Sequence, residues 1–104
     1  MLLNPGTVLR GRYEIVEKIG SGGMAVVYRG RDRELERYVT VKVLREEYIG
    51  DDEFIERFRS QARSAAKLSH PNIVRVYDVG ADDDINFIVM EYIKAPTINK
   101  MDLS

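Results

Sequence analysis

The sequence predicts an α+β fold in which a five-stranded antiparallel sheet is combined with one main helix. Three segments with the alternation or the β-branched content of strands come first. One long segment with helical periodicity follows, and two more strand-like segments complete the pattern. The chain has 104 residues, the size of one domain. We therefore expect a single unit in the order strand, strand, strand, helix, strand, strand.

The first three strands are expected over residues 13–20, 24–31 and 38–44. The first alternates apolar and acidic side chains, and the second is rich in β-branched and aromatic residues. The charged segment 31–37 between the second and third strands is typical of a hairpin tip. Successive side chains of a strand point to opposite faces, so the third strand presents two different sets. One face carries Thr40, Lys42 and Leu44, and the other carries Val39, Val41 and Val43.

The apolar period lengthens after Gly50, and residues 51–69 predict a helix. Its first turn is acidic and its last turn is basic, an order that complements the helix dipole. The segment HPNIV ends the helix, because the residue before a proline avoids helical angles. Strands are expected over 73–80 and 85–93, joined by an acidic turn, and the tail after Pro96 has the pattern of a short helix. The inward stripe of the main helix is predicted to consist of Phe54, Phe58, Gln61, Ala65 and Leu68.

Composition excludes several classes of protein. The net charge is -1, so no bulk field favours nucleic acid or an anionic membrane surface. There is no cysteine, which rules out disulfides and thiolate metal sites. No apolar run approaches the roughly 18 residues of a membrane span, and the N-terminal residues lack the pattern of a signal peptide. We expect a cytoplasmic chain that contacts neither nucleic acid nor membrane.

The segment IGSGGMAVVY, residues 19–28, carries three glycines at positions 20, 22 and 23. With Ala25 it fits G-x-G-x-x-A, a permitted form of the dinucleotide-binding fingerprint. That fingerprint requires a helix directly after the glycines, whereas strand-forming residues follow here, so a dinucleotide fold is disfavoured. Two interpretations remain: a plain hairpin turn, or a loop whose backbone N–H groups approach phosphate oxygens. In the second, Lys42 on a neighbouring strand would neutralise phosphate charge.

Several segments in order resemble the N-terminal lobe of a protein kinase, most of all that of bacterial serine/threonine kinases of the eukaryotic type. These segments are GRYEIVEKIGSGGMAVVYRGRD, YVTVKVL, FIERFRSQARSAAKLSHPNIVRVYDVG and FIVMEYI, and the resemblance covers about residues 9–93. It implies that the glycine-rich loop covers the phosphates of ATP and that Lys42 pairs with the α- and β-phosphates. It also implies that Val27 packs on adenine, that Met90 lies at the back of the adenine pocket and that residues 91–93 form the hinge. The nucleotide-binding residues implied are Ile19, Gly20, Ser21, Gly22, Gly23, Ala25, Val27, Thr40, Lys42, Gln61, Met90, Glu91 and Ile93.

Three positions depart from the family pattern. Ala25 replaces the third glycine of the loop, where a small residue is tolerated. Thr40 stands where alanine is usual and adds a hydroxyl and volume against the expected adenine site. Gln61 replaces the glutamate that holds the lysine by an ion pair, and glutamine accepts a hydrogen bond but cannot neutralise Lys42. A weakened lysine clamp is expected, against the plainer interpretation of Gln61 as a polar residue at the edge of the core stripe.

The sequence contains neither the catalytic loop H-R-D-x-x-x-x-N nor the D-F-G motif of this family. We therefore expect no catalytic residue and negligible kinase activity from this chain alone, with magnesium arriving only as the counter-ion of ATP. His70 is implied to be structural. Three functions stay open: a nucleotide-binding lobe, a non-binding interaction fragment, or a piece that completes an active kinase with another chain. A homodimer through the lobe or its exposed surface is also plausible.

Overall fold

The computed structural model describes residues 3–67 and 75–93 and has one sheet and one long helix. Its sheet has six antiparallel strands in the order β1-β2-β3-β4-β6-β5. The predicted fold class is confirmed, with six strands in place of five. The elements are β1 (Val8–Leu9), β2 (Tyr13–Ser21), β3 (Ala25–Asp32), β4 (Arg37–Leu44), the short 3-10 helix η1 (Glu46–Tyr48), α1 (Asp52–Lys67), β5 (Val76–Asp82) and β6 (Ile85–Glu91).

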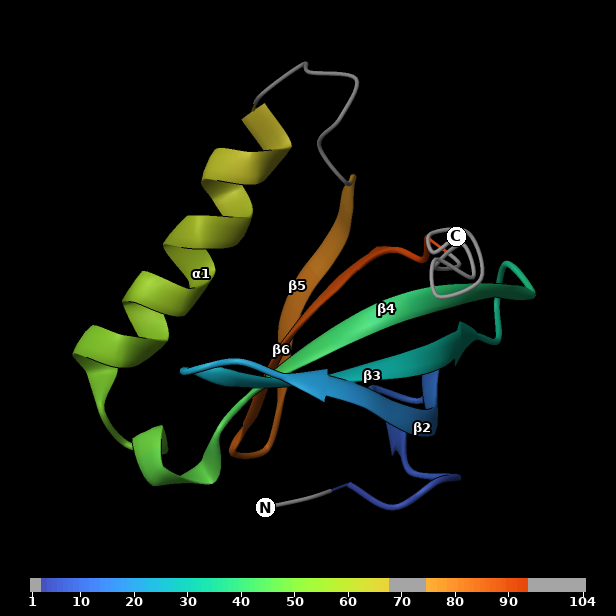
Figure 1. Ribbon diagram of the computed structural model, residues 1–104, viewed down its shortest axis with the longest axis horizontal. Coiled ribbons are helices and arrows are strands. Elements are labelled where there is room, and N and C mark those ends of the chain that lie inside the picture. Colours follow the sequence, from blue (N-terminus) through green and yellow to red (C-terminus); the bar gives the residue numbers. More distant parts are fainter. Residues whose placement is uncertain (1–2, 68–74, 94–104) are drawn as a thin grey trace, which may run out of the picture.

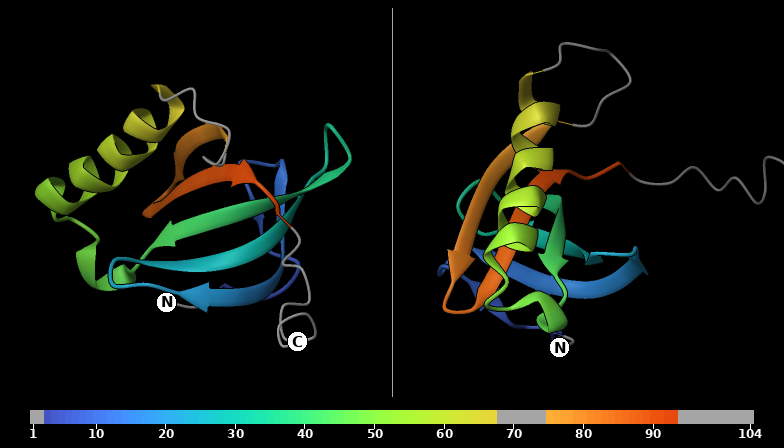
Figure 2. Two further views of the ribbon diagram at one scale, coloured as in Figure 1. Left: turned by 45° about the horizontal axis from the view of Figure 1, so that its top comes forward. Right: turned by 90° about the vertical axis from the view of Figure 1, so that its left-hand side faces the viewer.

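The sheet is strongly twisted, so that β5 at one edge crosses β2 instead of running alongside it (Figure 1, Figure 2). This crossing brings the two ends of the sheet together. The Tyr13 hydroxyl donates to Asp78 Oδ2 at 2.7 Å, and the backbone N–H of Arg10 donates to Asp82 Oδ2 at 2.7 Å. These two bonds join the β1–β2 end to the edge strand β5, which protects that edge from pairing with other chains.

The larger hydrophobic cluster lies on the face of the sheet away from α1. The Tyr13 and Phe87 rings meet edge to face at 5.9 Å between centroids. Alternation along β4 places its three valines in this cluster, as predicted, because the side-chain period of a strand is two. The buried members are Leu9, Tyr13, Ile15, Val26, Tyr28, Val39, Val41, Val43, Phe87 and Val89.

The helix α1 packs on the opposite face, next to β5 and β6 (Figure 1). It begins where Asp51 Oδ1 accepts a hydrogen bond from the backbone N–H of Phe54, which caps the first turn. The predicted stripe is only partly right. Phe58 is buried, but the second buried position is Ala62, and Gln61 is exposed. The small Ala62 lets the helix approach the sheet closely, and the second cluster unites Ala25, Leu44, Phe58, Ala62 and Ile88.

Several sequence predictions fall outside the described residues. They concern the side chains of Ala65 and Leu68, the segment HPNIV with His70, the first residues of the strand expected from 73, and the tail after Ile93. Within the described part, the extra strand β1 precedes a backbone turn in which Arg10 and Gly11 have positive φ of 54° and 67°. β6 ends at Glu91, two residues earlier than predicted.

Candidate functional site

The glycine-rich segment forms the turn between β2 and β3, where the backbone N–H of Gly22 donates to the Ala25 carbonyl at 2.8 Å. Gly20, Gly22 and Gly23 all lack positive φ. A Cβ built on any of the three would meet nothing within 4 Å. Neither the backbone geometry of the turn nor crowding by protein atoms therefore requires glycine here. What the missing side chains leave is open space around the backbone, which is the property a phosphate-binding loop needs.

A pocket of about 420 Å³ lies between this turn, the sheet and α1. The turn lines it on one side together with Lys42 of β4, and the helix contributes Phe58 and Gln61. Val27 lies directly opposite Lys42 in the β3–β4 ladder, and Ile88 lies opposite Lys42 in the β4–β6 ladder. Seven of the predicted residues line this pocket: Ser21, Gly22, Gly23, Ala25, Val27, Lys42 and Gln61.

Lys42 occupies the predicted face of β4. Its neighbours on that face are Thr40 and Leu44, of which Leu44 is buried against the helix. In the ranges 3–67 and 75–93, no hydrogen bond or ion pair joins the Lys42 ammonium to another residue. An unpaired cation beside a turn with open backbone is a suitable environment for an anion.

Gln61 reaches the same pocket from α1. Its side chain is exposed at the pocket edge, whereas the sequence placed it on an inward stripe. Among the described residues no carboxylate lines the pocket, and Lys42 is the one charged residue of this lining. This arrangement leaves the lysine available to a ligand but without the ion pair that would fix its orientation.

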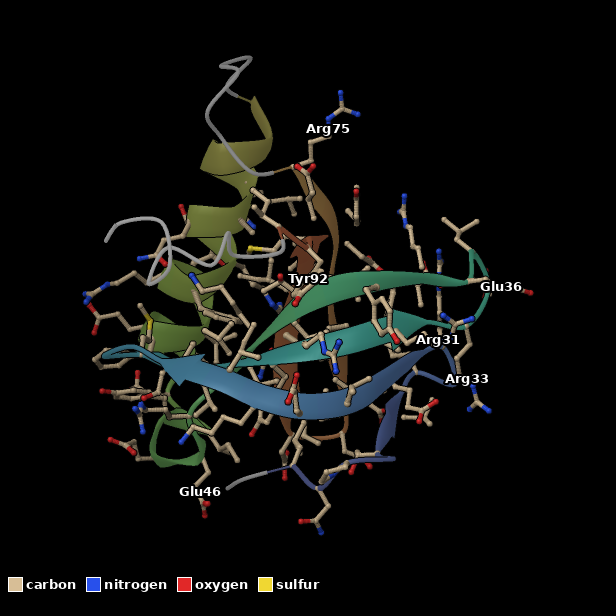
Figure 3. The ribbon with its side chains drawn as sticks, turned by 45° about the vertical axis from the view of Figure 1, so that its right-hand side comes forward. Arg31, Arg33, Glu36, Glu46, Arg75 and Tyr92 are labelled. Atoms are coloured by element: carbon tan, nitrogen blue, oxygen red, sulfur yellow. The ribbon has the colours of Figure 1, made fainter. Side chains whose placement is uncertain are left out.

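The remaining predicted residues lie outside the lining of this pocket. Thr40 and Met90 are directly opposite each other in the β4–β6 ladder, two residues along the strand from Lys42. Ile19 and Ile93 are exposed, and Gly20 pairs with Val27 on the adjoining edge of the sheet. Glu91 ends β6, and Figure 3 shows Tyr92 just beyond it, where its ring lies 6.2 Å from that of Tyr38.

Two kinds of contact at the site were missed by sequence reasoning. Met24 joins the pocket lining, and Phe58 closes it from the helix in addition to its place in the core. Arg45, the residue after β4, donates two hydrogen bonds from its guanidinium to the Gly22 carbonyl. A contact between a side chain and a distant carbonyl leaves no periodic signal in a sequence, so pattern analysis does not find it.

The pKa shifts lie far from this pocket, at the opposite end of β2 and β3. Hydrogen bonds from Arg12 hold the pKa of Asp32 below its ordinary value. Burial, followed by the hydrogen bond to Asp78, raises the pKa of Tyr13. In the described part of the chain, no group of three or more His, Cys, Asp or Glu residues is arranged to hold a metal ion. Across the same residues, no helix is long and apolar enough to span a membrane.

Comparison with known proteins decides the family. The model of the protein kinase domain matches residues 13–102. The chain belongs to the protein kinase family. The resemblance drawn from the glycine-rich segment, the lysine strand and the helix is thereby confirmed.

Similar bacterial kinases are known. The chain is 51% identical over 96 residues to a probable serine/threonine-protein kinase of Clostridium acetobutylicum. It is 52% identical over 95 residues to the serine/threonine-protein kinase PrkC of Bacillus subtilis. The two matches cover 92% and 91% of this chain, but it spans only about 15% of each relative.

Solved kinase structures share the fold. The PknI kinase domain of Mycobacterium tuberculosis superposes with a TM-score of 0.71 at 31% identity, over 97% of this chain and 41% of that one. The apo form of PpkA-294 gives a TM-score of 0.78 at 23% identity, over 99% of this chain and 43% of that one. At that identity the second likeness concerns the fold alone. The first match corresponds to part of a larger kinase domain, because it covers 41% of the PknI chain.

Proposed function

We propose that this chain is the ATP-binding part of a serine/threonine kinase domain and holds the nucleotide phosphates between the glycine turn and Lys42. One observation carries the proposal: Gly22 and Gly23, which the fold itself does not require, line a pocket in which Lys42 is the one charged residue among the described lining residues, and no described residue pairs with it. Backbone N–H groups without side chains in the way can approach phosphate oxygens, and the ammonium offsets their negative charge.

The base of the nucleotide would extend from the pocket toward Met90 and the end of β6. Val27 and Thr40 lie on the same face of the sheet as Lys42, and Thr40 and Met90 are directly opposite each other. The backbone groups that follow β6 would supply hydrogen bonds to the edge of the adenine. Thr40 narrows this region relative to an alanine and offers a hydroxyl to the base.

The chain's own residues fit magnesium only as a companion of ATP. The described lining residues include no carboxylate, and proteins usually bind Mg²⁺ through one or two carboxylates together with substrate phosphates. Phosphoryl transfer also needs a base and metal ligands that the family carries in its H-R-D and D-F-G motifs, which do not occur in this sequence. We therefore propose binding without turnover by this chain on its own.

Calorimetric titration with ATP, with and without Mg²⁺, tests the proposal. Replacing Lys42 by alanine removes the one charged side chain among the described lining residues and is expected to weaken binding about tenfold or more. The matched control is Lys18→Ala, which removes an exposed lysine of β2 that does not line the pocket. Equal affinity in the two variants, or no heat up to millimolar ATP in the unchanged chain, would refute the proposal.

A gain-of-function variant sharpens the same test. Gln61→Glu places a carboxylate at the pocket edge, where it can pair with Lys42 and fix its direction. If Gln61 weakens the clamp, the variant should bind Mg·ATP several-fold more tightly than the unchanged chain. Affinity equal to or lower than that of the unchanged chain would show that Gln61 plays no part in holding the lysine. Mass measurement on the same samples tests the alternative of a dimerising fragment.

A further inference from the structure

Arg45 makes three hydrogen bonds to the glycine turn. Its Nε and one terminal nitrogen donate to the Gly22 carbonyl at 3.1 and 2.9 Å, and its backbone N–H donates to the Met24 carbonyl at 3.0 Å. Arg45 directly follows β4 and stands three residues after Lys42. The residue that binds the turn therefore directly follows the strand that carries the pocket lysine.

The two glycines of the turn make no side-chain contacts, whereas Met24, which follows them, packs against the second cluster. The Gly22 N–H is bonded to Ala25, but Gly22 and Gly23 have no side chains that pack, and open space surrounds them. Glycine loses more conformational freedom on ordering than any other residue. The planar guanidinium restricts this freedom because two donors on one acceptor fix direction as well as distance.

Holding the Gly22 carbonyl also fixes the next N–H group. The peptide unit is planar and trans, so the carbonyl of Gly22 and the N–H of Gly23 point in opposite directions. Gly22 and Gly23 line the pocket, whereas Arg45 is absent from its lining. A carbonyl held by Arg45 outside the pocket leaves the Gly23 N–H directed to the other side, where phosphate oxygens would lie in front of Lys42.

We propose that Arg45 is a positioning residue that fixes the Gly22 carbonyl and so turns the Gly23 N–H toward the nucleotide phosphates. The inference rests on the proposed function for its ligand. The ordering of the turn by the fork, the pair of guanidinium donors of Arg45 on the Gly22 carbonyl, is measurable without any nucleotide.

The test uses the whole chain with Arg45→Ala, Arg45→Lys and the control Arg33→Ala. Lysine keeps the charge but cannot form the fork. Arg33 lies in the hairpin beyond the far end of β3 (Figure 3), a strand of eight residues and so about 26 Å long. Thermal melts of all three variants establish that each remains folded.

Two readouts separate this inference from the proposed function. Both Arg45 variants should lower the NMR order parameter of the Gly23 amide in the nucleotide-free chain, from near 0.85 to below about 0.6. Both should weaken ATP binding about tenfold, the effect of one lost charge-assisted hydrogen bond, while Arg33→Ala changes neither quantity.

The failures are distinguishable. An unchanged order parameter in Arg45→Ala, with ATP binding intact, overturns the role of Arg45 and leaves the proposed function standing. If Arg45→Lys keeps both the Gly23 order parameter and the ATP affinity of the unchanged chain, the two-donor contact of the guanidinium is not needed, because charge alone suffices. In a third outcome, Arg45→Ala loosens the turn but the unchanged chain binds no ATP. That result overturns the nucleotide assignment and with it both proposals.

Discussion

Asp32 is buried at the end of β3 and holds together the end of the sheet opposite the pocket. Its carboxylate accepts two hydrogen bonds from the Arg12 guanidinium, each 2.9 Å long, and two more from the backbone N–H groups of Glu34 and Leu35 at 3.0 and 3.2 Å. Replacing Asp32 by alanine removes all four acceptor contacts. The Arg12 guanidinium and the backbone N–H groups of Glu34 and Leu35 then lose this acceptor and must bind water instead.

The expected loss follows from these contacts. Breaking a buried ion pair by deleting one partner costs about 3–5 kcal/mol. The Arg12 side chain is 29% exposed and regains water when its partner is lost, so the lower end, about 3 kcal/mol, applies to Asp32→Ala. Small domains have roughly 5–15 kcal/mol of total stability, so the variant should unfold at a much lower denaturant concentration.

Acid provides an internal check on the origin of this loss. The folded state holds the pKa of Asp32 below its unfolded value, chiefly through the hydrogen bonds from Arg12. A group of this kind stabilises the fold fully above its unfolded pKa of about 3.9, and that stabilisation disappears as pH falls through the lower folded pKa. The difference between the unchanged chain and Asp32→Ala should therefore be largest near neutral pH and shrink below about pH 4.

Urea titrations followed by circular dichroism at pH 7 and pH 3 measure both effects. Asp84→Ala is the control, because Asp84 is an exposed aspartate in the β5–β6 turn and should change stability by less than about 0.5 kcal/mol. If Asp32→Ala costs no more than Asp84→Ala at pH 7, the carboxylate does not hold this end of the sheet. A difference that persists undiminished at pH 3 would show that lost packing, not lost charge, causes the destabilisation.

Two further predictions concern the stability of the sheet. A Cβ at Gly30 would lie 2.9 Å from Val41 Cγ2 and 3.0 Å from a backbone oxygen of β2, so Gly30→Ala should destabilise the chain by about 1–3 kcal/mol in urea titration. Gly20→Ala, which meets nothing within 4 Å, is the control, and equal effects would contradict the steric argument. Tyr13→Phe removes the bond to Asp78 and should cost about 1–2 kcal/mol at pH 7. Because the folded state raises the pKa of Tyr13 above its unfolded value of about 10, the unchanged chain should lose stability above pH 10 more steeply than Tyr13→Phe, and parallel curves would refute this.

The order and type of the long elements could be predicted because each has a clear period. β4 alternates without interruption, so the face of Lys42 followed from counting. β1 was missed because two residues, Val8–Leu9, are too short to show any alternation. Its position depends on a turn with positive φ and on pairing with Tyr13 and Glu14, which are tertiary features.

The helix illustrates a different limit. Periodicity identified α1 and its acidic first turn, but it did not fix which stripe faces the sheet. Which helix side chains become buried depends on contact with Leu44 and Ile88 of the sheet. The position of that surface relative to the helix cannot be derived from the periodicity of the helix sequence. As a result Gln61 lies exposed at the pocket edge and not in the core stripe where the periodicity placed it.

The two faces of β4 link stability to the candidate site. Three valines on one face are locked in the core, and their burial fixes the register that places Lys42 between Val27 and Ile88. A slip of one residue would exchange the faces, so the lysine cannot change its side of the sheet without loss of the core. No comparable packing holds Gly22 and Gly23, because the absent side chains that leave the backbone open also remove packing contacts. The contact from Arg45 resolves this conflict, since it restrains a carbonyl on the outside of the turn and leaves the pocket side open.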